Sequence, residues 1–140
     1  MATPVLKVTG INHVVLHVRD MTQSLAFYRG VLGFETRNES DGPGPKRAFL
    51  RCGSQGLDLF EVTEEVYGGK EMNHMALNVE AEELAEILTG LAAAGVAASE
   101  PTKRNSVFIH DPDGHQIEML PLSANERRHE RERAQAALSS

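Results

Sequence analysis

The sequence predicts an α+β protein made of two tandem βαβββ modules, and two internal repeats carry this prediction. Residues 11–18 (INHVVLHV) and 72–79 (MNHMALNV) are nearly the same, and their histidines, His13 and His74, lie 61 positions apart. Residues 57–60 (LDLF) recur as residues 117–120 (IEML), which matches Asp58 with Glu118. A repeat with a fixed offset of about 60 residues indicates a duplicated unit.

The first half of the chain has the pattern strand, helix and three strands. Residues 11–18 alternate like a half-buried strand. Asp20 is expected to cap a helix that runs to Val31 and ends at Gly33. The helix face expected to pack on this strand holds Leu25, Tyr28 and Leu32. Further strands are expected over residues 34–39, 48–51 and 57–62, with turns at 41–45 and 53–56.

The second half repeats this order. A strand over residues 74–79 precedes an amphipathic helix over 81–94, which Gly95 should end. Short strands are expected over residues 97–99, 106–110 and 116–120, with a tight turn at 111–114. The predicted organisation is an N-terminal extension (1–9), two modules (10–68 and 69–122) and a charged C-terminal helix or tail (123–140).

Composition excludes several classes of protein. The single cysteine, Cys52, rules out an internal disulfide and favours a cytoplasmic location. No apolar run is long enough to span a bilayer, so no membrane partner is expected. A net charge of −6 and the absence of tryptophan argue against nucleic acid as a partner.

The repeated polar residues are candidate metal ligands. Side chains two apart on a strand share a face, so His13, His74, Asp58 and Glu118 should lie on the sheet faces away from the helices. If the two sheets form one curved mixed sheet around a cavity, these side chains converge. Two imidazoles and a carboxylate suit a divalent ion such as Mn, Fe, Ni, Co or Zn. The alternative for any one of these residues is a solvated strand position.

His13, His74 and Glu118 are the predicted ligands, whereas two roles are open for Asp58. Asp58 is one methylene shorter than Glu118 and is interpreted as a catalytic base or as the holder of a metal-bound water. Direct ligation is the other interpretation.

The two halves resemble the paired βαβββ modules of the vicinal oxygen chelate superfamily. The matching stretches are NHVVLHVRD with LAFYRGVLGFE, then NHMALNV, then FIHDPDGHQIE, within residues 9–122. This superfamily includes glyoxalase I, methylmalonyl-CoA epimerase, extradiol dioxygenases and fosfomycin-resistance proteins. The resemblance implies a homodimer in which a divalent ion chelates two neighbouring oxygens of a small-molecule substrate.

Features of the individual subfamilies conflict. Fosfomycin-resistance enzymes carry a serine where Ser106 stands and an arginine near the position of Arg127 or Arg128, but their threonine and tyrosine are replaced by Val15 and Phe108. Glyoxalase I and the epimerase carry Glu or Gln in place of Asp58. The predicted substrate contacts are Phe60, Ser106, Phe108 and Arg127.

The resulting prediction is a metal-dependent enzyme with lyase, isomerase or thiol-transferase chemistry on a substrate with vicinal oxygens. One alternative is an Fe(II)-dependent extradiol-type dioxygenase. The other is a non-catalytic drug-binding protein like the bleomycin-resistance proteins, against which the ligand set His13, His74 and Glu118 argues.

Overall fold

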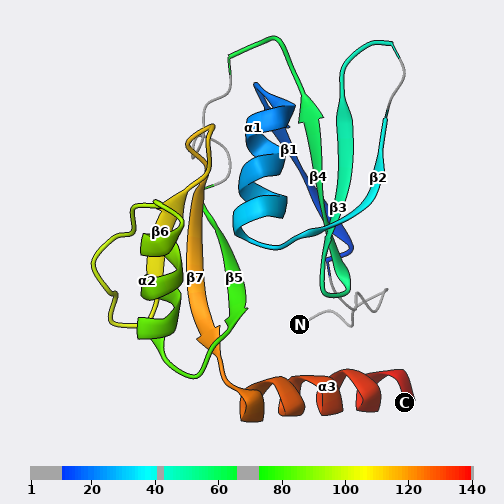
Figure 1. Ribbon diagram of the computed structural model, residues 1–140. Coiled ribbons are helices and arrows are strands. Elements are labelled where there is room, and N and C mark those ends of the chain that lie inside the picture. Colours follow the sequence, from blue (N-terminus) through cyan, green and yellow to red (C-terminus); the bar gives the residue numbers. More distant parts are fainter. Residues whose placement is uncertain (1–10, 41–42, 66–72, 140) are drawn as a thin grey trace, which may run out of the picture. The chain divides into compact units, whose positions relative to one another are not determined.

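The chain divides into two compact units, Met1–Val66 and Tyr67–Ser140. The computed structural model describes residues 11–40, 43–65 and 73–139. Each unit combines one sheet with helices, in agreement with the predicted α+β class (Figure 1). The predicted module boundaries after residues 9 and 68 lie outside the described residues. Within the described part of the chain, no helix is both long enough and apolar enough to cross a membrane.

The first unit contains a four-stranded sheet in the order β1-β4-β3-β2. Its strands are β1 (His13–Val18), β2 (Glu35–Glu39), β3 (Arg47–Cys52) and β4 (Gln55–Glu61). β1 pairs with β4 in parallel, and the other two pairings are antiparallel. Leu16 and Val18 are buried whereas Val15 and His17 are exposed, as the predicted alternation requires, but Val14, on the same face as Leu16, is exposed.

The helix of the first unit begins as predicted but changes type. Asp20 caps α1 (Met21–Leu25) by accepting a hydrogen bond from the backbone N–H of Gln23 at 3.0 Å. The helix then continues as a π-helix, η1 (Ala26–Val31), and Gly33 follows it with a φ of 78°. The π-helical turn changes the residue spacing. The buried positions are therefore Met21, Ser24, Phe27 and Tyr28, whereas the predicted Leu25 and Leu32 are only half-buried.

The second unit contains a three-stranded sheet in the order β5-β7-β6. Its strands are β5 (Met75–Glu80), β6 (Val107–His110) and β7 (Gln116–Leu122), and its helices are α2 (Leu84–Ala93) and α3 (Ala124–Ser139). Gly95 follows α2 with a φ of 73°, which agrees with its predicted role. The side chains of α3 are mostly exposed, as its charged sequence predicts.

The strand predicted over residues 97–99 does not form. Ser99 keeps one backbone bond to the neighbouring strand, from its N–H to the carbonyl oxygen of Phe108 at 2.9 Å. Pro101 follows two residues later and has no N–H to donate to a ladder, so the pairing does not extend. The second sheet therefore has one strand fewer than the first.

The central strands have the same register in both units. In the first unit Val15 of β1 pairs with Asp58 of β4, and in the second Ala76 of β5 pairs with Glu118 of β7. Val15 and Ala76 are 61 residues apart, and Asp58 and Glu118 are 60 apart, so the sequence repeat is also a repeat of strand pairing. This register places the repeated polar residues at equivalent positions of the two sheets.

Candidate metal centre

The two repeated carboxylates lie on the central strand of each sheet and are almost completely buried. Asp58 and Glu118 are each 4% exposed. Their strand neighbours Leu57, Leu59, Ile117 and Met119 are buried as well, so both faces of the central strands are covered. Because a buried carboxylate is costly without partners, the groups around each one matter.

Each carboxylate faces the histidine of its own unit. His13 begins β1 and His74 directly precedes β5, two residues before the positions that pair with Asp58 and Glu118. Residues two apart share a face of the sheet. The Nε2 atom of His13 lies 3.8 Å from Asp58 Oδ2, and the Nε2 atom of His74 lies 3.4 Å from Glu118 Oε1.

The other nitrogen of each ring contacts the preceding asparagine. His13 Nδ1 lies 2.8 Å from Asn12 Oδ1, and His74 Nδ1 lies 2.7 Å from Asn73 Oδ1. An amide oxygen only accepts, so this contact is a hydrogen bond when the ring proton is on Nδ1, and Nε2 of the neutral ring then carries a lone pair. Sequence reasoning missed both asparagines, although each precedes a histidine in the repeated strands.

The donor set fits a divalent cation. A lone pair on Nε2 beside a carboxylate oxygen is a nitrogen–oxygen donor pair of the kind that binds divalent ions. Two ligand atoms bound at about 2.1 Å to one tetrahedral ion are about 3.4 Å apart, and the His74–Glu118 separation is 3.4 Å. In addition, the buried Oδ1 atom of Asp58 has no hydrogen-bond partner among the described residues.

The surroundings of the two carboxylates differ. Ser106 is fully buried, and its hydroxyl donates to Glu118 Oε2 at 2.6 Å. The hydroxyl of Thr102 lies 2.6 Å from that of Ser106, which completes a hydroxyl chain of these two residues ending on Glu118. The Nε atom of Arg104 is 4.0 Å from the same carboxylate oxygen. Glu118 is thus held in place by a hydrogen bond from Ser106, whose own hydroxyl is fixed by Thr102.

Asp58 has an arginine near it instead of a hydroxyl. The closest Arg37 nitrogen is 3.8 Å from Asp58 Oδ1, beyond hydrogen-bonding distance. Arg37 lies where the pairing of β2 with β3 shifts register between Thr36 and Asn38. Such a bulge changes the direction of a side chain, which sequence periodicity does not predict.

The predicted substrate contacts lie in different surroundings. The Phe108 ring packs edge-on against His74 with centroids 5.3 Å apart, and the Phe60 ring packs edge-on against Phe49 at 6.3 Å. Phe60 also lies under the guanidinium of Arg47. Both Phe60 and Phe108 are half-buried. The hydroxyl of Ser106, by contrast, is already bonded inside the second unit.

The structure does not bring Arg127 to the candidate ligands of its own unit. An Arg127 nitrogen lies 2.9 Å from a carboxylate oxygen of Glu80, the last residue of β5. His74 lies at the other end of β5, about 20 Å away along an extended strand. Arg127 therefore attaches α3 to the end of β5 in the second unit.

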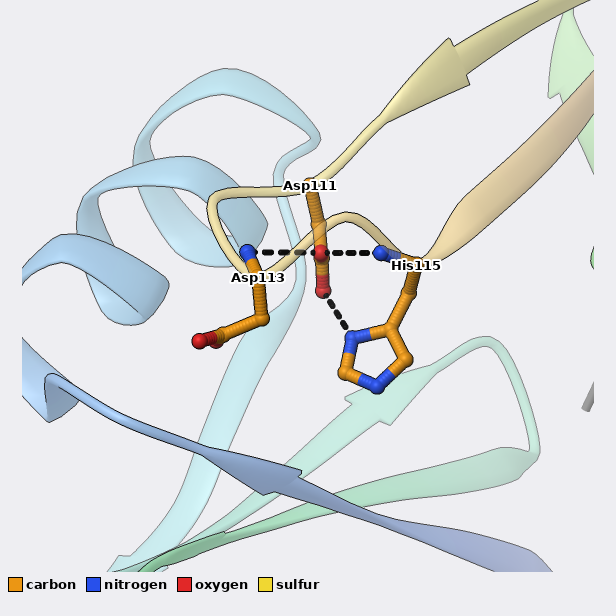
Figure 2. A group of neighbouring side chains, drawn as sticks. All are labelled: Asp111, Asp113 and His115. Carbon is orange, nitrogen blue, oxygen red and sulfur yellow. Dashed lines mark hydrogen bonds and ion pairs between the residues drawn. The ribbon is translucent and has the colours of Figure 1, made fainter. Parts of the chain in front are cut away.

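A second group of ligand-type residues lies in the turn between β6 and β7 (Figure 2). Asp111, Asp113 and His115 are buried, and one ligand atom of each lies within 4.8 Å of the others. Asp111 Oδ1 accepts the backbone N–H groups of Asp113 and His115, and its Oδ2 lies 2.8 Å from His115 Nδ1. The hydrogen bond with the Asp111 side chain raises the pKa of His115, and the charges of Asp111 and Asp113 act in the same direction. The two backbone bonds and the contact between Asp111 and His115 stabilise the turn that the sequence predicts at residues 111–114.

Cys52 is half-buried, and its burial raises the pKa of the thiol. A raised pKa reduces the thiolate fraction at neutral pH, so Cys52 is expected to be a weak nucleophile.

Comparison with known proteins identifies the family. The family sequence model of the Glyoxalase/Bleomycin resistance protein/Dioxygenase superfamily matches residues 10–119 of this chain. The lactoylglutathione lyase of Salmonella typhimurium is 32% identical and covers 77% of this chain and 89% of its own. The metallothiol transferase FosB of Staphylococcus saprophyticus is 31% identical, with 80% and 76% covered.

A solved structure shares the fold. A variant of the fosfomycin resistance protein FosX from Listeria monocytogenes, in complex with Mn(II) and 1S,2S-dihydroxypropylphosphonic acid, has a TM-score of 0.70 at 22% identity. The match covers 86% of this chain and 98% of that one. The chain belongs to the Glyoxalase/Bleomycin resistance protein/Dioxygenase superfamily. This confirms the recognised family, its fold and the predicted class of metal-dependent enzyme that uses a divalent ion.

Proposed function

We propose that this protein is a metal-dependent lyase or isomerase acting on a small substrate with two neighbouring oxygens. The supporting observation is the equivalent histidine–carboxylate pair in each unit, at 3.8 and 3.4 Å. The similarity to lactoylglutathione lyase supports the same class of reaction. The lactoyl group itself carries a hydroxyl and a carbonyl oxygen on adjacent carbons, which is the arrangement that a chelating ion recognises.

In this proposal the residues have distinct roles. The Nε2 atoms of His13 and His74 and the Oε1 atom of Glu118 hold the ion. When bound, a divalent ion would polarise a substrate carbonyl and make the neighbouring C–H group more acidic. Asp58 accepts that proton, because its Oδ1 atom has no hydrogen bond to the described residues.

Two of the predicted substrate contacts are retained in the proposal. Phe60 and Phe108 are half-buried aromatic residues that provide apolar surface. Ser106 and Arg127 are assigned instead to Glu118 and Glu80, the groups that they contact.

A second candidate reaction is thiol transfer to a small phosphonate. The similarity to FosB favours it, whereas Val15 and Phe108 replace the threonine and tyrosine of fosfomycin-resistance enzymes. The relatives support neither the dioxygenase nor the drug-binding alternative.

We also propose that the protein is a cytoplasmic homodimer. The family resemblance supports the dimer and the single cysteine supports the compartment. Light scattering during size-exclusion chromatography should give twice the mass of the chain, and a monomer mass would contradict the dimer. Cell fractionation should place the protein with cytoplasmic markers.

The metal site can be tested by elemental analysis of purified protein incubated with a divalent ion and then desalted. Wild-type protein should retain one ion per chain if the two pairs share an ion. His74→Ala should retain none, whereas the control His129→Ala, an exposed residue of α3, should bind like wild type. Full metal in His74→Ala would place the site elsewhere, and two ions per chain would mean that each pair binds its own.

The reaction can be tested with lactoylglutathione in D₂O. A proton-abstracting enzyme should exchange the hydrogen on the carbon between the hydroxyl and the thioester carbonyl, which NMR detects directly. The exchange should stop when a chelator removes the metal. Thiol consumption in the presence of fosfomycin tests the second candidate, and activity only in that assay would overturn the lyase or isomerase proposal.

A further inference from the structure

The same asparagine–histidine contact is present among the described residues of both units. Asn12 Oδ1 lies 2.8 Å from His13 Nδ1, and Asn73 Oδ1 lies 2.7 Å from His74 Nδ1. Both asparagines are exposed; Asn12 directly precedes β1, and Asn73 lies two residues before the start of β5. The family match and the proposed reaction assign no role to either residue.

We propose that Asn12 and Asn73 are positioning residues that hold His13 and His74 in the tautomer with the proton on Nδ1. This proposal rests on the proposed function, because it places the Nε2 atoms toward the divalent ion. A neutral imidazole has one N–H, and an amide oxygen at Nδ1 is satisfied only when that proton is on Nδ1. The lone pair of Nε2 is then available as a ligand, and the ring cannot rotate without losing the bond.

The opposite amide orientation explains the geometry less well. With the amide NH₂ facing Nδ1, the ring proton would lie on Nε2 and point toward the carboxylate. The separations from Nε2 to the carboxylate oxygens are 3.8 Å for His13 and 3.4 Å for His74. Both exceed the usual length of an N–H···O bond. Both units show the same arrangement, so the contact belongs to the structural repeat.

Variants of Asn73 separate the effect of its hydrogen-bond acceptor from the effect of its side-chain size. Asn73→Asp keeps an oxygen acceptor, whereas Asn73→Leu has a similar size and no acceptor. Asn78→Leu is the matched control, because Asn78 is an exposed asparagine of β5, the strand that follows Asn73. The equivalent pair, Asn12→Asp and Asn12→Leu, repeats the test in the first unit.

The first readout is the tautomer of the metal-free protein. Long-range ¹H–¹⁵N NMR spectra should be recorded at pH 8.5, about two units above the pKa of an unperturbed imidazole. Wild type, Asn73→Asp and Asn78→Leu should show His74 with its proton on Nδ1. Asn73→Leu should show a mixture or the Nε2-protonated form. A wild-type spectrum from Asn73→Leu would overturn the proposal.

The second readout is the affinity for Mn²⁺ or Zn²⁺, measured by competition with a chromophoric chelator. Loss of an outer partner of a ligating histidine typically weakens binding about 10- to 100-fold. We expect the lower part of this range for Asn73→Leu, since the His74 side chain is partly exposed, and recovery in Asn73→Asp. Binding within twofold of wild type would contradict the proposal. If wild type itself binds no divalent ion, the proposed function fails, while the metal-free NMR spectrum still decides the role of the asparagines.

Discussion

Replacing Ser106 with alanine should destabilise the second unit and disturb the orientation of Glu118. The Ser106 hydroxyl is fully buried, lies 2.6 Å from both Thr102 Oγ1 and Glu118 Oε2, and donates to the carboxylate. Alanine fills nearly the same space but removes this donor. Glu118 is 4% exposed, so water cannot readily replace the lost bond.

The magnitude follows from the charge and burial of the acceptor. A hydrogen bond to a charged group contributes about 1.5–3 kcal/mol, and a buried group left without its partner costs a similar amount. We therefore expect Ser106→Ala to lower the free energy of unfolding by about 2 kcal/mol, which corresponds to about a 30-fold change in the folding equilibrium. Binding of a divalent ion should weaken as well, because Glu118 loses the bond that orients its other oxygen.

Urea unfolding of the metal-free protein measures the first effect, and chelator competition measures the second. Ser54→Ala, at an exposed turn position, is the control and should change neither quantity. Repeating Ser106→Ala in a Glu118→Gln background isolates the pair, because most of the cost should disappear when the charge is absent. A cost below about 0.5 kcal/mol, the usual range of a neutral surface change, would refute the reasoning.

Three further predictions follow from the structure. Gly56→Ala should weaken metal binding and lower the free energy of unfolding by about 1–3 kcal/mol, because its new Cβ would lie 2.8 Å from His13 Cβ. The control is Gly30→Ala, whose new Cβ meets nothing within 4 Å. Equal effects of the two substitutions would contradict the steric explanation. Asp58→Asn should keep the metal in elemental analysis but lower turnover, because an amide cannot accept the proton. Unchanged turnover would remove Asp58 from the mechanism, and loss of the metal would show that Asp58 is a ligand. Because the pKa of His115 is raised in the folded protein, its ion pair stabilises the fold fully below about pH 6.5 and loses this contribution as pH rises through the folded pKa. The difference in the free energy of unfolding between wild type and His115→Gln should therefore be larger at pH 5.5 than at pH 8.5. Equal differences at the two pH values would refute this.

Most of the local structure could be predicted because it depends on neighbouring residues. The Asp20 cap and the stops at Gly33 and Gly95 are set by side-chain chemistry and backbone freedom within one turn of helix. The π-helix over residues 26–31 was not predicted. It depends on how Phe27 and Tyr28 pack, with their rings edge-on at 5.1 Å.

The candidate ligands could be predicted because they are repeated, but their partners could not. The offsets between His13 and His74 and between Asp58 and Glu118 are visible in the chain. Arg37 reaches the neighbourhood of Asp58 from a bulged strand, and no spacing in the sequence indicates that contact. The alternative that each carboxylate is simply a solvated strand position does not hold, because both Asp58 and Glu118 are buried.

The sequence by itself determined the duplication, the α+β class and the four residues that form the two histidine–carboxylate pairs, because repeats and strand alternation are properties of the chain. Only the tertiary structure decided what each carboxylate contacts. The hydroxyl chain on Glu118 comes from the loop before β6, and Arg37 approaches Asp58 from the register shift in β2. Hydrogen bonds between distant residues depend on register and backbone direction to within a few tenths of an ångström, and no local pattern carries that information.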